Sequence, residues 1–278
     1  MTAVAWGVCL LFGVLVGTAS GLLGIGGGTL LVPFLYTVVA AGSWAGVVID
    51  PSMGVVVAHA TSLVVTLPTA ISGMFAYRTT GLAHWRIVVW MGTGAALGAA
   101  AGARVAPHLA PALLQGLFGA LLLIAALRMF VKSTTAAPPS QDRDRWVSLL
   151  GFGLGIGFFA ALLGVGGGIF AIPVLVYFTR LELPRVAATS LGIVVFASAS
   201  GSLVYLLSAE AVSGDAATVG LILVPAALAL IPGAVLGAWV GAALNRRVSG
   251  DNLRFVFAVL FAVLGLRYLL QNASMLLG

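Results

Sequence analysis

Residues 17–35 read GTASGLLGIGGGTLLVPFL, and residues 157–175 read GFFAALLGVGGGIFAIPVL. Aligned from their first residues, the two stretches share a glycine triplet and, shortly after it, a proline. Three adjacent glycines destabilise a helix by about 1 kcal/mol each relative to alanine. A helix is therefore expected to break at each triplet, and a short helix is expected to begin near Thr29 and near Ile169. The two prolines then fall at about the end of the first turn, where a missing N–H does least harm.

The whole chain of 278 residues is far more apolar than a soluble protein. Hydrophobic residues make up 61% and charged residues 7% of it, with a mean hydropathy of +1.17, whereas soluble chains carry about 25% charged residues. Residues 6–28 alone are 23 residues without a charge, and a membrane-spanning helix needs about 20. The composition predicts an all-α polytopic membrane protein. The net charge of +6 is then attributed to cytoplasmic loops rather than to a nucleic-acid partner.

The similarity between the two halves extends beyond the glycine triplets. Residues 60–63 (ATSL) recur as residues 188–191, and glycines spaced four apart follow in both halves. The order of these features is kept while the connecting loops change in length. The sequence therefore predicts two membrane repeats, residues 1–131 and 147–278, joined by a polar cytoplasmic linker at residues 132–146.

Each repeat contains five apolar segments, and the second segment of each is too short to span about 30 Å of hydrocarbon comfortably. The segments cover residues 3–22, 29–41, 53–76, 86–105 and 111–131 in the first repeat and 147–163, 169–179, 186–207, 217–243 and 251–271 in the second.

The placement of cationic residues indicates how the short segments behave. If the first two segments of each repeat make an even number of crossings, as two spans or as a re-entrant hairpin, the cations divide 11 against 2; if they form one broken span, the division is 7 against 6. The positive-inside rule favours the first arrangement, which gives inverted repeats with both termini periplasmic. The eleven are Arg78, Arg86, Arg128, Lys132, Arg143, Arg145, Arg180, Arg185, Arg246, Arg247 and Arg254, and the two are Arg104 and Arg267.

The glycine breaks are also the strongest candidates for a ligand site. Irregular backbone at membrane depth is tolerated only inside the protein or beside a water-filled cavity. Each break would present unpaired amides and the positive end of a short helix, which suits an anion. The alternative is that the glycines only permit close helix packing. The candidate substrate-binding residues are Gly26, Gly27, Gly28 and Thr29 in the first repeat and Gly166, Gly167, Gly168 and Ile169 in the second.

Hydroxyl groups and one histidine lie early in the third segment of the repeats. Thr61 and Ser62, with their counterparts Thr189 and Ser190, are expected to contact substrate at a central site, unless each hydroxyl bonds only its own helix. His59 is the one histidine inside a predicted span, and its counterpart is an alanine. It is a candidate for proton coupling or anion contact, with a purely structural, hydrogen-bonded histidine as the alternative.

Three further groups of residues receive structural interpretations. Glycines at four-residue spacing predict a close helix–helix face in each half. Tyr77 and Tyr205 are expected in the interfacial aromatic belt, or as gates of a cavity. Arg128 and Arg267 lie near segment ends, where snorkelling to the interface is expected. The spaced glycines are Gly94, Gly98 and Gly102 in the first half and Gly233, Gly237 and Gly241 in the second.

Several classes of function lack the residues they would need. All seven acidic residues fall in loops, segment ends or the linker, so a carboxylate-lined cation pathway is not expected. The glycine strings lack the lysine of an ATP-binding loop. With three histidines and one cysteine, a zinc site is poorly supplied. The sequence therefore predicts no metal, no cofactor and no catalytic residue.

The strings GLLGIGGGTLLVPFL and ALLGVGGGIFAIPVL, each followed by an ATSL segment, resemble the TauE/SafE sulfite exporter family over nearly the whole chain. The resemblance implies a bacterial inner-membrane permease for small sulfur-containing anions such as sulfite or organosulfonates. Export is the commonest direction it implies, and import is known among relatives. The residues themselves indicate only an anion.

Together these observations predict a secondary transporter that works by alternating access, with one half rocking against the other. Its partners are a small anionic substrate and membrane lipid, with a homo-oligomer left open. The alternatives are an anion channel or passive facilitator, an importer of a related anion, and an intramembrane enzyme or assembly factor. The last would need an acid–base or metal constellation inside the membrane, which the sequence does not supply.

Overall fold

The computed structural model describes residues 3–40, 51–78, 81–130, 146–179, 181, 183–208, 218–245 and 250–276. Within these residues, six helices are long and apolar enough to cross a membrane, and four shorter apolar helices accompany them. The prediction of an all-α polytopic membrane protein is confirmed. The predicted linker lies outside the described residues, apart from Trp146.

The helices follow the predicted segments closely. The first half contains α1 (Ala3–Leu23), α2 (Gly28–Ala40), α3 (Pro51–Tyr77), α4 (Trp85–Val105), the 3-10 helix η2 (Ala106–His108) and α5 (Pro111–Phe130). The second half contains α6 (Trp146–Leu162), α7 (Gly168–Tyr177), α8 (Leu183–Leu206), α9 (Val224–Leu244) and α10 (Gly250–Leu276).

Two details of the predicted segments are wrong. The segment expected from residue 217 begins as a helix only at Val224, because β1 (Thr218–Val219) and β2 (Ile222–Leu223) form a short hairpin that turns through Gly220, at φ 57°. The prolines expected at the end of the first turn lie in the second turn, because α2 and α7 already begin at the last glycine of each triplet.

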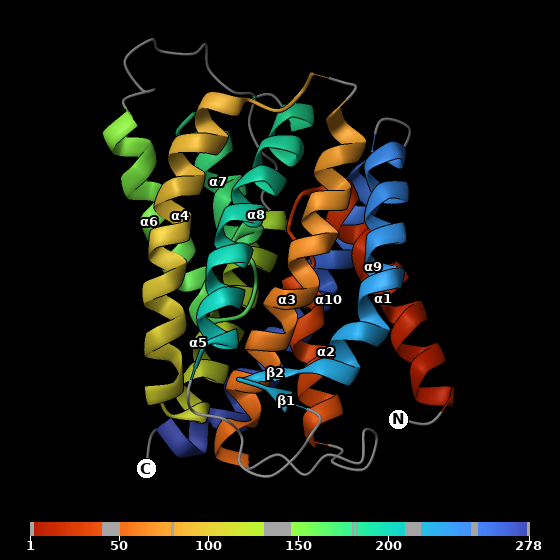
Figure 1. Cartoon of the computed structure of the whole chain (residues 1–278), viewed down its shortest axis with the longest axis vertical. Coiled ribbons are helices and arrows are strands. Elements are labelled where there is room, and N and C mark those ends of the chain that lie inside the picture. The colour runs from red at the N-terminus through yellow and green to blue at the C-terminus, as the bar shows by residue number, and fades with distance from the viewer. Residues whose placement is uncertain are drawn as a thin grey trace.

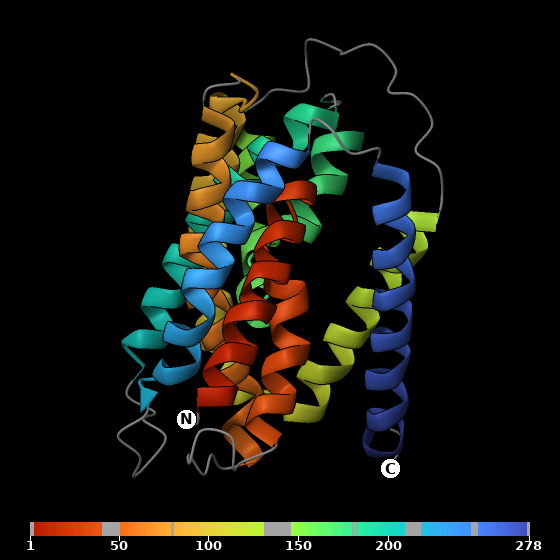
Figure 2. The same cartoon turned by 90° about the vertical axis from the view of Figure 1, so that its right-hand side faces the viewer.

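The first two helices of each half reverse direction at the glycine break. Figures 1 and 2 show α2 running back toward the end of the bundle at which α1 begins, and α7 running back toward the end at which α6 begins. The first helix of the chain begins and α10 ends at the same end of the bundle. This is the geometry that an even number of crossings requires.

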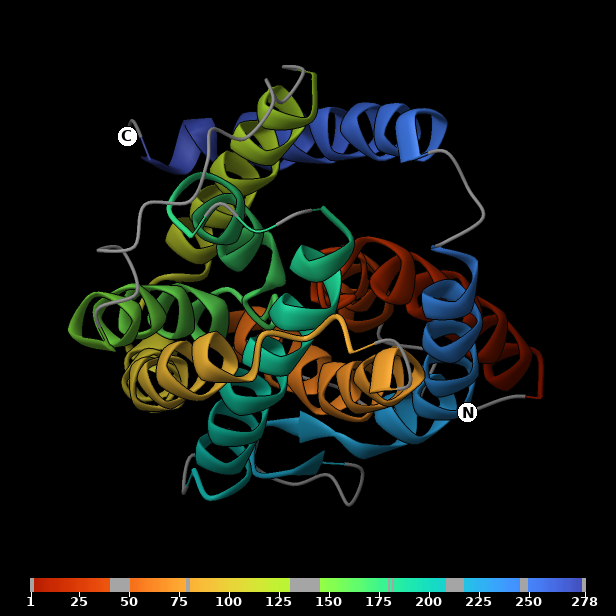
Figure 3. The ribbon, with the colours of Figure 1, turned by 90° about the horizontal axis from the view of Figure 1, so that it is seen from above.

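The two halves are interleaved rather than separate. The main neighbour of α1 is α9, and the main neighbour of α4 is α6, so the first helix of each half packs on the fourth helix of the other. In Figure 3 these two pairs flank the central helices α3 and α8, and α5 lies beside α10. Rocking of one half against the other remains an expectation, and it would have to act against these contacts between the halves.

The spaced glycines make these cross-half contacts possible. A Cβ on Gly94, Gly98 or Gly102 of α4 would collide with backbone carbonyl oxygens of α6. Similarly, a Cβ on any of the three glycines of α9 would collide with carbonyl oxygens of Leu10, Val14 and Thr18 in α1. The helices approach until backbone meets backbone, and the predicted helix–helix face is confirmed.

The predicted interfacial position of Tyr77 and Tyr205 is wrong. Both side chains are buried, with 2% and 0% of their surface exposed. The Tyr77 hydroxyl donates a 2.9 Å hydrogen bond to the carbonyl of Gly21, and the Tyr205 hydroxyl donates one of 2.9 Å to the carbonyl of Ala161. Each tyrosine therefore ties the third helix of its half to the first. The Arg128 side chain is exposed, with its guanidinium 5.5 Å from the centre of the Tyr177 ring.

Candidate functional site

The two glycine breaks have the same backbone conformation. Gly24, Gly26 and Gly27 have φ values of 72°, 83° and 75°, and their counterparts Gly164, Gly166 and Gly167 have values of 68°, 76° and 97°. This left-handed region is strongly unfavourable for residues with a Cβ. The breaks therefore depend on glycine for their shape as well as for space.

The two breaks lie in direct contact with one another. A Cβ on Gly28 would lie 2.6 Å from the carbonyl carbon of Val165, and a Cβ on Gly168 would collide with the carbonyl groups of Gly24 and Ile25. Thus α2 and α7 begin beside each other in the interior and run to opposite ends of the bundle (Figure 1). The structure brings together the glycines that the sequence singled out in each half.

Each break leaves several backbone amides without an acceptor. In α2 the amides of Leu30 and Leu31 donate to the carbonyl of Gly27, and in α7 the amides of Phe170 and Ala171 donate to the carbonyl of Gly167. The preceding amides, at the positive end of each helix, find no acceptor among the described residues, as an anion site requires. These amides belong to Gly26, Gly27, Gly28, Thr29, Gly166, Gly167, Gly168 and Ile169.

Two of the four predicted hydroxyls hold the breaks in place. Ser62 on α3 donates a 2.8 Å hydrogen bond to the carbonyl of Gly164, and Ser190 on α8 donates to the carbonyl of Gly24. Each serine thus binds the break of the other half. Both break carbonyls precede the short helices, so these two bonds fix where α2 and α7 begin.

The neighbouring threonines are also engaged by backbone. The Thr61 hydroxyl donates to the carbonyl of Val57 at 2.7 Å and accepts from the amide of Leu223 at 2.9 Å. The Thr189 hydroxyl accepts from the amide of His84 at 3.1 Å. Leu223 and His84 directly precede α9 and α4, so each threonine fixes the start of a fourth helix.

A different set of hydroxyls lies at the breaks without any partner. Ser20, Thr29, Thr66 and Ser198 are completely buried, and none of their hydroxyls forms a hydrogen bond within the described part of the chain. A buried hydroxyl without a partner costs about 1–3 kcal/mol, so each of these four calls for a ligand or a water.

Three of these residues lie against glycines of the breaks, Ser20 and Ser198 through the hydroxyl oxygen and Thr66 through its methyl group. A Cβ on Gly166 would lie 3.2 Å from the Ser198 Oγ and 2.6 Å from the Thr66 methyl group, and a Cβ on Gly27 would lie 3.7 Å from the Ser20 Oγ. The sequence predicted only Thr29 of the four. A usable signal was present, because Thr66 follows Ser62 by one helical turn and Ser198 follows Ser190 by two.

Apolar side chains complete the region around the breaks. Val194 of α8 meets both Gly26 and Gly166, at 3.0 Å and 3.3 Å from the position of a Cβ. Gly167 faces Ile156 and Ala160 of α6 at 3.2 Å and 3.3 Å. The surroundings therefore combine neutral hydrogen-bond donors with hydrocarbon.

His59 lies beside the second break but directs its ring elsewhere. A Cβ on Gly164 would lie 2.5 Å from the His59 Cα. The His59 Nε2 is 2.5 Å from the Tyr36 hydroxyl of α2, inside a cluster with Phe118 and Tyr268. The ring is completely buried, and its Nδ1 has no partner in the described structure. His59 thus links α3 to one short helix while its backbone supports the other break.

None of the arginine side chains that the structure describes is buried. All of them are exposed. Thr66 follows His59 by seven residues, which is about 10 Å along a helix. Backbone amide and hydroxyl dipoles are the described groups at the breaks that can stabilise a negative charge.

Comparison with known proteins identifies the family. The model of the sulfite exporter TauE/SafE family matches residues 9–268. The chain belongs to this family. A probable membrane transporter protein of Methanocaldococcus jannaschii is 28% identical over 262 residues, covering 94% of both chains. The probable membrane transporter protein YunE of Bacillus subtilis is 25% identical over 290 residues, covering 95% of this chain and 97% of its own.

A third relative matches over a shorter part. The probable membrane transporter protein MamO of Paramagnetospirillum magneticum is 35% identical over 121 residues, which is 42% of this chain and 18% of the relative. No solved structure matches the chain. Family membership and the names of these relatives identify a TauE/SafE membrane transporter, and not an enzyme, as predicted.

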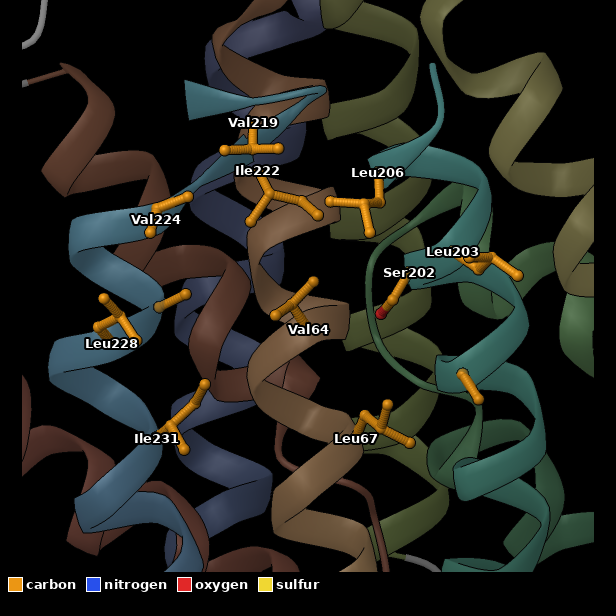
Figure 4. A pocket seen from close by; sticks show the side chains of 12 residues that line it. Val64, Leu67, Ser202, Leu203, Leu206, Val219, Ile222, Val224, Leu228 and Ile231 are labelled. Atoms are coloured by element: carbon orange, nitrogen blue, oxygen red, sulfur yellow. The ribbon is translucent and has the colours of Figure 1, made fainter. Parts of the chain in front are cut away.

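This TauE/SafE chain also has an apolar groove of about 470 Å³, and none of the break residues 24–29 and 164–169 is among the residues that line it. It lies between α3, α8, α9 and the hairpin, where Val64, Leu67, Leu203 and Leu228 line it (Figure 4). Ser202 is its one polar lining residue, and Figure 4 shows this side chain turned toward α3. Such a lining suits hydrocarbon and offers little to an anion, so the groove is not the candidate substrate site.

Proposed function

We propose that this membrane transporter is a secondary transporter that exports small sulfur-containing oxyanions, such as sulfite or organosulfonates, across a bacterial inner membrane. The observation that carries the proposal is the contact between two opposed short helices, whose free amides and four unpartnered buried hydroxyls converge in the interior. The family supplies sulfur as the expected element of the substrate. The site chemistry supplies a preference for an anion.

Alternating access follows from the burial of this site. Residues 24–30 and 161–168 are buried, so a substrate between the breaks is closed off from both ends of the bundle in this conformation. Transport then requires each end to open in turn. Because α1 packs on α9 and α4 packs on α6, the two units that move each combine helices from both repeats.

The proposed orientation follows from the arginines. Arg78, Arg86, Arg128 and Arg185 lie at helix ends on the side opposite the start of α1, and the positive-inside rule makes that side cytoplasmic. Both termini are then periplasmic.

His59 is the proposed coupling residue. Protonation would turn Nε2 into a donor and reverse its hydrogen bond with Tyr36, which would alter the tie between α3 and α2. The other ionisable groups around the His59–Tyr36 pair are the hydroxyls of Tyr268 and Tyr205. A His59→Gln variant is expected to lose the pH dependence of flux, and full retention would remove His59 from the mechanism.

Reconstitution in liposomes tests the proposed function. Flux of sulfite, sulfoacetate, thiosulfate and sulfate is measured with and without a pH gradient. Gly27→Leu and Gly167→Leu are expected to abolish flux, whereas Gly151→Leu, where a Cβ meets nothing within 4 Å, is the matched control. Unchanged flux in the first two variants contradicts the amide site. Flux that depends on neither pH nor a counter-ion indicates a channel or passive facilitator instead, and flux only inward indicates an importer.

A further inference from the structure

The apolar groove between α8 and α9 lies in the part of the chain that spans the membrane. Its walls belong to the candidate spans Met53–Tyr77, Arg185–Leu206 and Val224–Leu244. Figure 4 shows α8 on one side, α9 on the other, and Val64 and Leu67 of α3 between them, with the hairpin across one end. The groove therefore leaves part of α3, a central helix, uncovered at a depth where the surroundings are lipid.

The internal repeat contains an equivalent place that is closed by side chains. It lies between α3, α4 and α8 of the repeat-related arrangement. A Cβ on Gly92 of α4 would lie 2.7 Å from the Phe196 ring of α8, and a Cβ on Gly192 of α8 would lie 2.7 Å from a methyl group of Val88 on α4. The groove has Pro68 at the position that corresponds to Phe196. Side chains of the protein thus close one of two related places and leave the other open.

Short side chains account for the open groove. At three lining positions the groove has a smaller residue than its counterpart in the other half. Two positions differ in the opposite sense, because Val64 and Ile231 stand where the other half has the glycines that admit Val88 and Phe196. Both kinds of exchange prevent the contact that closes the related place. The three smaller residues and their counterparts are Ala199 and Ile71, Ser202 and Met74, and Ala227 and Val88.

Lipid hydrocarbon is the occupant that the lining suits. A buried water needs two to four polar partners, and the lining residues offer one polar side chain, Ser202, and no charge. The rim of the groove is continuous with the lipid-facing surface, since Leu203 and Leu228 are 54% and 56% exposed. An acyl chain can therefore enter from the bilayer between α8 and α9.

The position of Ser202 suits the ester end of such a lipid. The Ser202 side chain is buried, and its hydroxyl has no partner among the described residues. Ser202 follows Val194, which meets both breaks, by eight residues, or about 12 Å along a helix. Half of the hydrocarbon layer is about 15 Å thick. With the breaks near the middle of the membrane, Ser202 lies close to the depth of the lipid ester carbonyls.

We propose that the groove holds one acyl chain of a membrane phospholipid. The chain lies against Val64 and Leu67 of α3, and its ester carbonyl accepts a hydrogen bond from the Ser202 hydroxyl. The lipid takes the place that protein side chains have in the other half. The site does not depend on the proposed substrate, since it requires only that these helices span the membrane.

A photoreactive lipid tests this site in the unchanged chain. The protein is reconstituted in liposomes of phosphatidylethanolamine and phosphatidylglycerol with a phosphatidylcholine that carries a diazirine on one acyl chain. Labelled residues are identified by mass spectrometry after irradiation. We expect label on the partly buried Val64 and Leu67, in addition to label from bulk lipid on Leu236 of α9, which is 65% exposed. Label on Leu236 alone overturns the proposal, because protein or water then covers α3.

The repeat supplies the variant that closes the groove. Ala199→Ile, Ser202→Met and Ala227→Val together give the groove the side chains of its counterpart. We expect this triple variant to lose the label on α3 and to keep the label on Leu236. The control Ala101→Ile, at an exposed position of α4, is expected to keep both. Label on α3 that persists in a monodisperse triple variant overturns the acyl-chain site.

A second measurement isolates the hydrogen bond of Ser202. Native mass spectrometry compares how much of an ester phospholipid and of its dialkyl ether analogue, which has no ester carbonyl, stays bound to the chain in detergent. We expect the unchanged chain to retain more of the ester lipid, and Ser202→Ala, which keeps the groove open, to retain both lipids equally. Equal retention of the two lipids by the unchanged chain contradicts the contact with Ser202.

Discussion

The break at residues 24–29 and the break at residues 164–169 have the same backbone path but different side chains around them. What the two breaks share is the set of hydrogen bonds that hold the surrounding helices together. Ser62 and Ser190 each donate a hydrogen bond to the break of the other half. Tyr77 and Tyr205 each connect the third helix of a half to its first. Ser72 and Ser200 donate 2.7 Å hydrogen bonds to the carbonyls of Val235 and Ala96. Every one of these hydroxyls donates to backbone.

What the breaks do not share is the set of polar groups without a partner. Ser20, Thr29, Thr66 and Ser198 have apolar counterparts, and so does His59, whose counterpart is Ala187. We therefore expect the side chains present in both halves to stabilise the fold, and the unpartnered side chains present in one half to affect transport. Four predictions test this division.

The largest effect is expected where a duplicated glycine is replaced. In Gly24→Ala the Cβ lies 2.6 Å from the Ala187 Cα at a φ of 72°, and in Gly164→Ala it lies 2.5 Å from the His59 Cα at a φ of 68°. Each variant is expected to lose about 3 kcal/mol or more of stability, seen as loss of monodisperse protein in detergent. Gly155→Ala, with nothing within 4 Å of the new Cβ, is the control. A large loss from only one of the two breaks contradicts their structural equivalence.

The next effect concerns transport rather than stability. Thr66→Val removes an unpartnered hydroxyl with little change in shape and is expected to reduce anion flux about tenfold or more while the unfolding temperature stays nearly constant. Thr69→Val is the matched control on the same helix, because its buried hydroxyl already donates 2.6 Å to the carbonyl of Val65. Equal anion flux from the two variants contradicts a role of the Thr66 hydroxyl in transport.

A smaller loss of stability is expected from the duplicated serines. Ser62→Ala and Ser190→Ala each leave a break carbonyl without its donor and are expected to cost about 1–2 kcal/mol, by similar amounts. Thermal unfolding in detergent measures both. Ser208→Ala, at a partly buried position just after α8, is expected to change stability by less than about 0.5 kcal/mol. A clear difference between the stability losses of Ser62→Ala and Ser190→Ala contradicts the proposed structural equivalence of the two breaks.

The smallest effect is expected from a hydroxyl found in one short helix only. Tyr36→Phe removes the hydrogen bond between α2 and His59 and is expected to cost about 1 kcal/mol in thermal unfolding. The control is Tyr177→Phe in α7, since the Tyr177 side chain is 52% exposed. If Tyr177→Phe lowers stability as much as Tyr36→Phe does, the hydrogen bond to His59 does not distinguish α2 from α7, and the prediction is wrong.

Most of the fold could be predicted from the sequence because its determinants are local. Charge-free segments of membrane length, a glycine triplet and glycines at four-residue spacing each act within one or two turns of helix. The hairpin before α9 escaped prediction since residues 217–223 are as apolar as the helix that follows. The burial of Tyr77 and Tyr205 escaped because aromatic residues at segment ends usually lie at the membrane interface.

The candidate site was predicted in its backbone but not in its side chains. The glycines alone define the breaks, so the amides could be predicted from the triplets. Whether a buried hydroxyl is engaged depends on which carbonyl faces it, and at Ser62 and Ser190 that carbonyl belongs to the other half. Sequence spacing contains no information about such a contact. Spacing could place Thr66 one turn after Ser62 on the same face of α3, but it could not show that Ser62 binds backbone and that Thr66 does not.

The interleaving of the halves has a consequence for biosynthesis. Helix α1 leaves the ribosome early, but the surface onto which its glycines fit belongs to α9, near the other end of the chain. During insertion, the face of α1 that packs on α9 is exposed to lipid until α9 has been made. The partner of α4, by contrast, is α6, which is made soon after α4 itself. We expect truncations that end before α9 to leave α1 accessible to cross-linking by lipid analogues, and the native contact to form only as translation finishes.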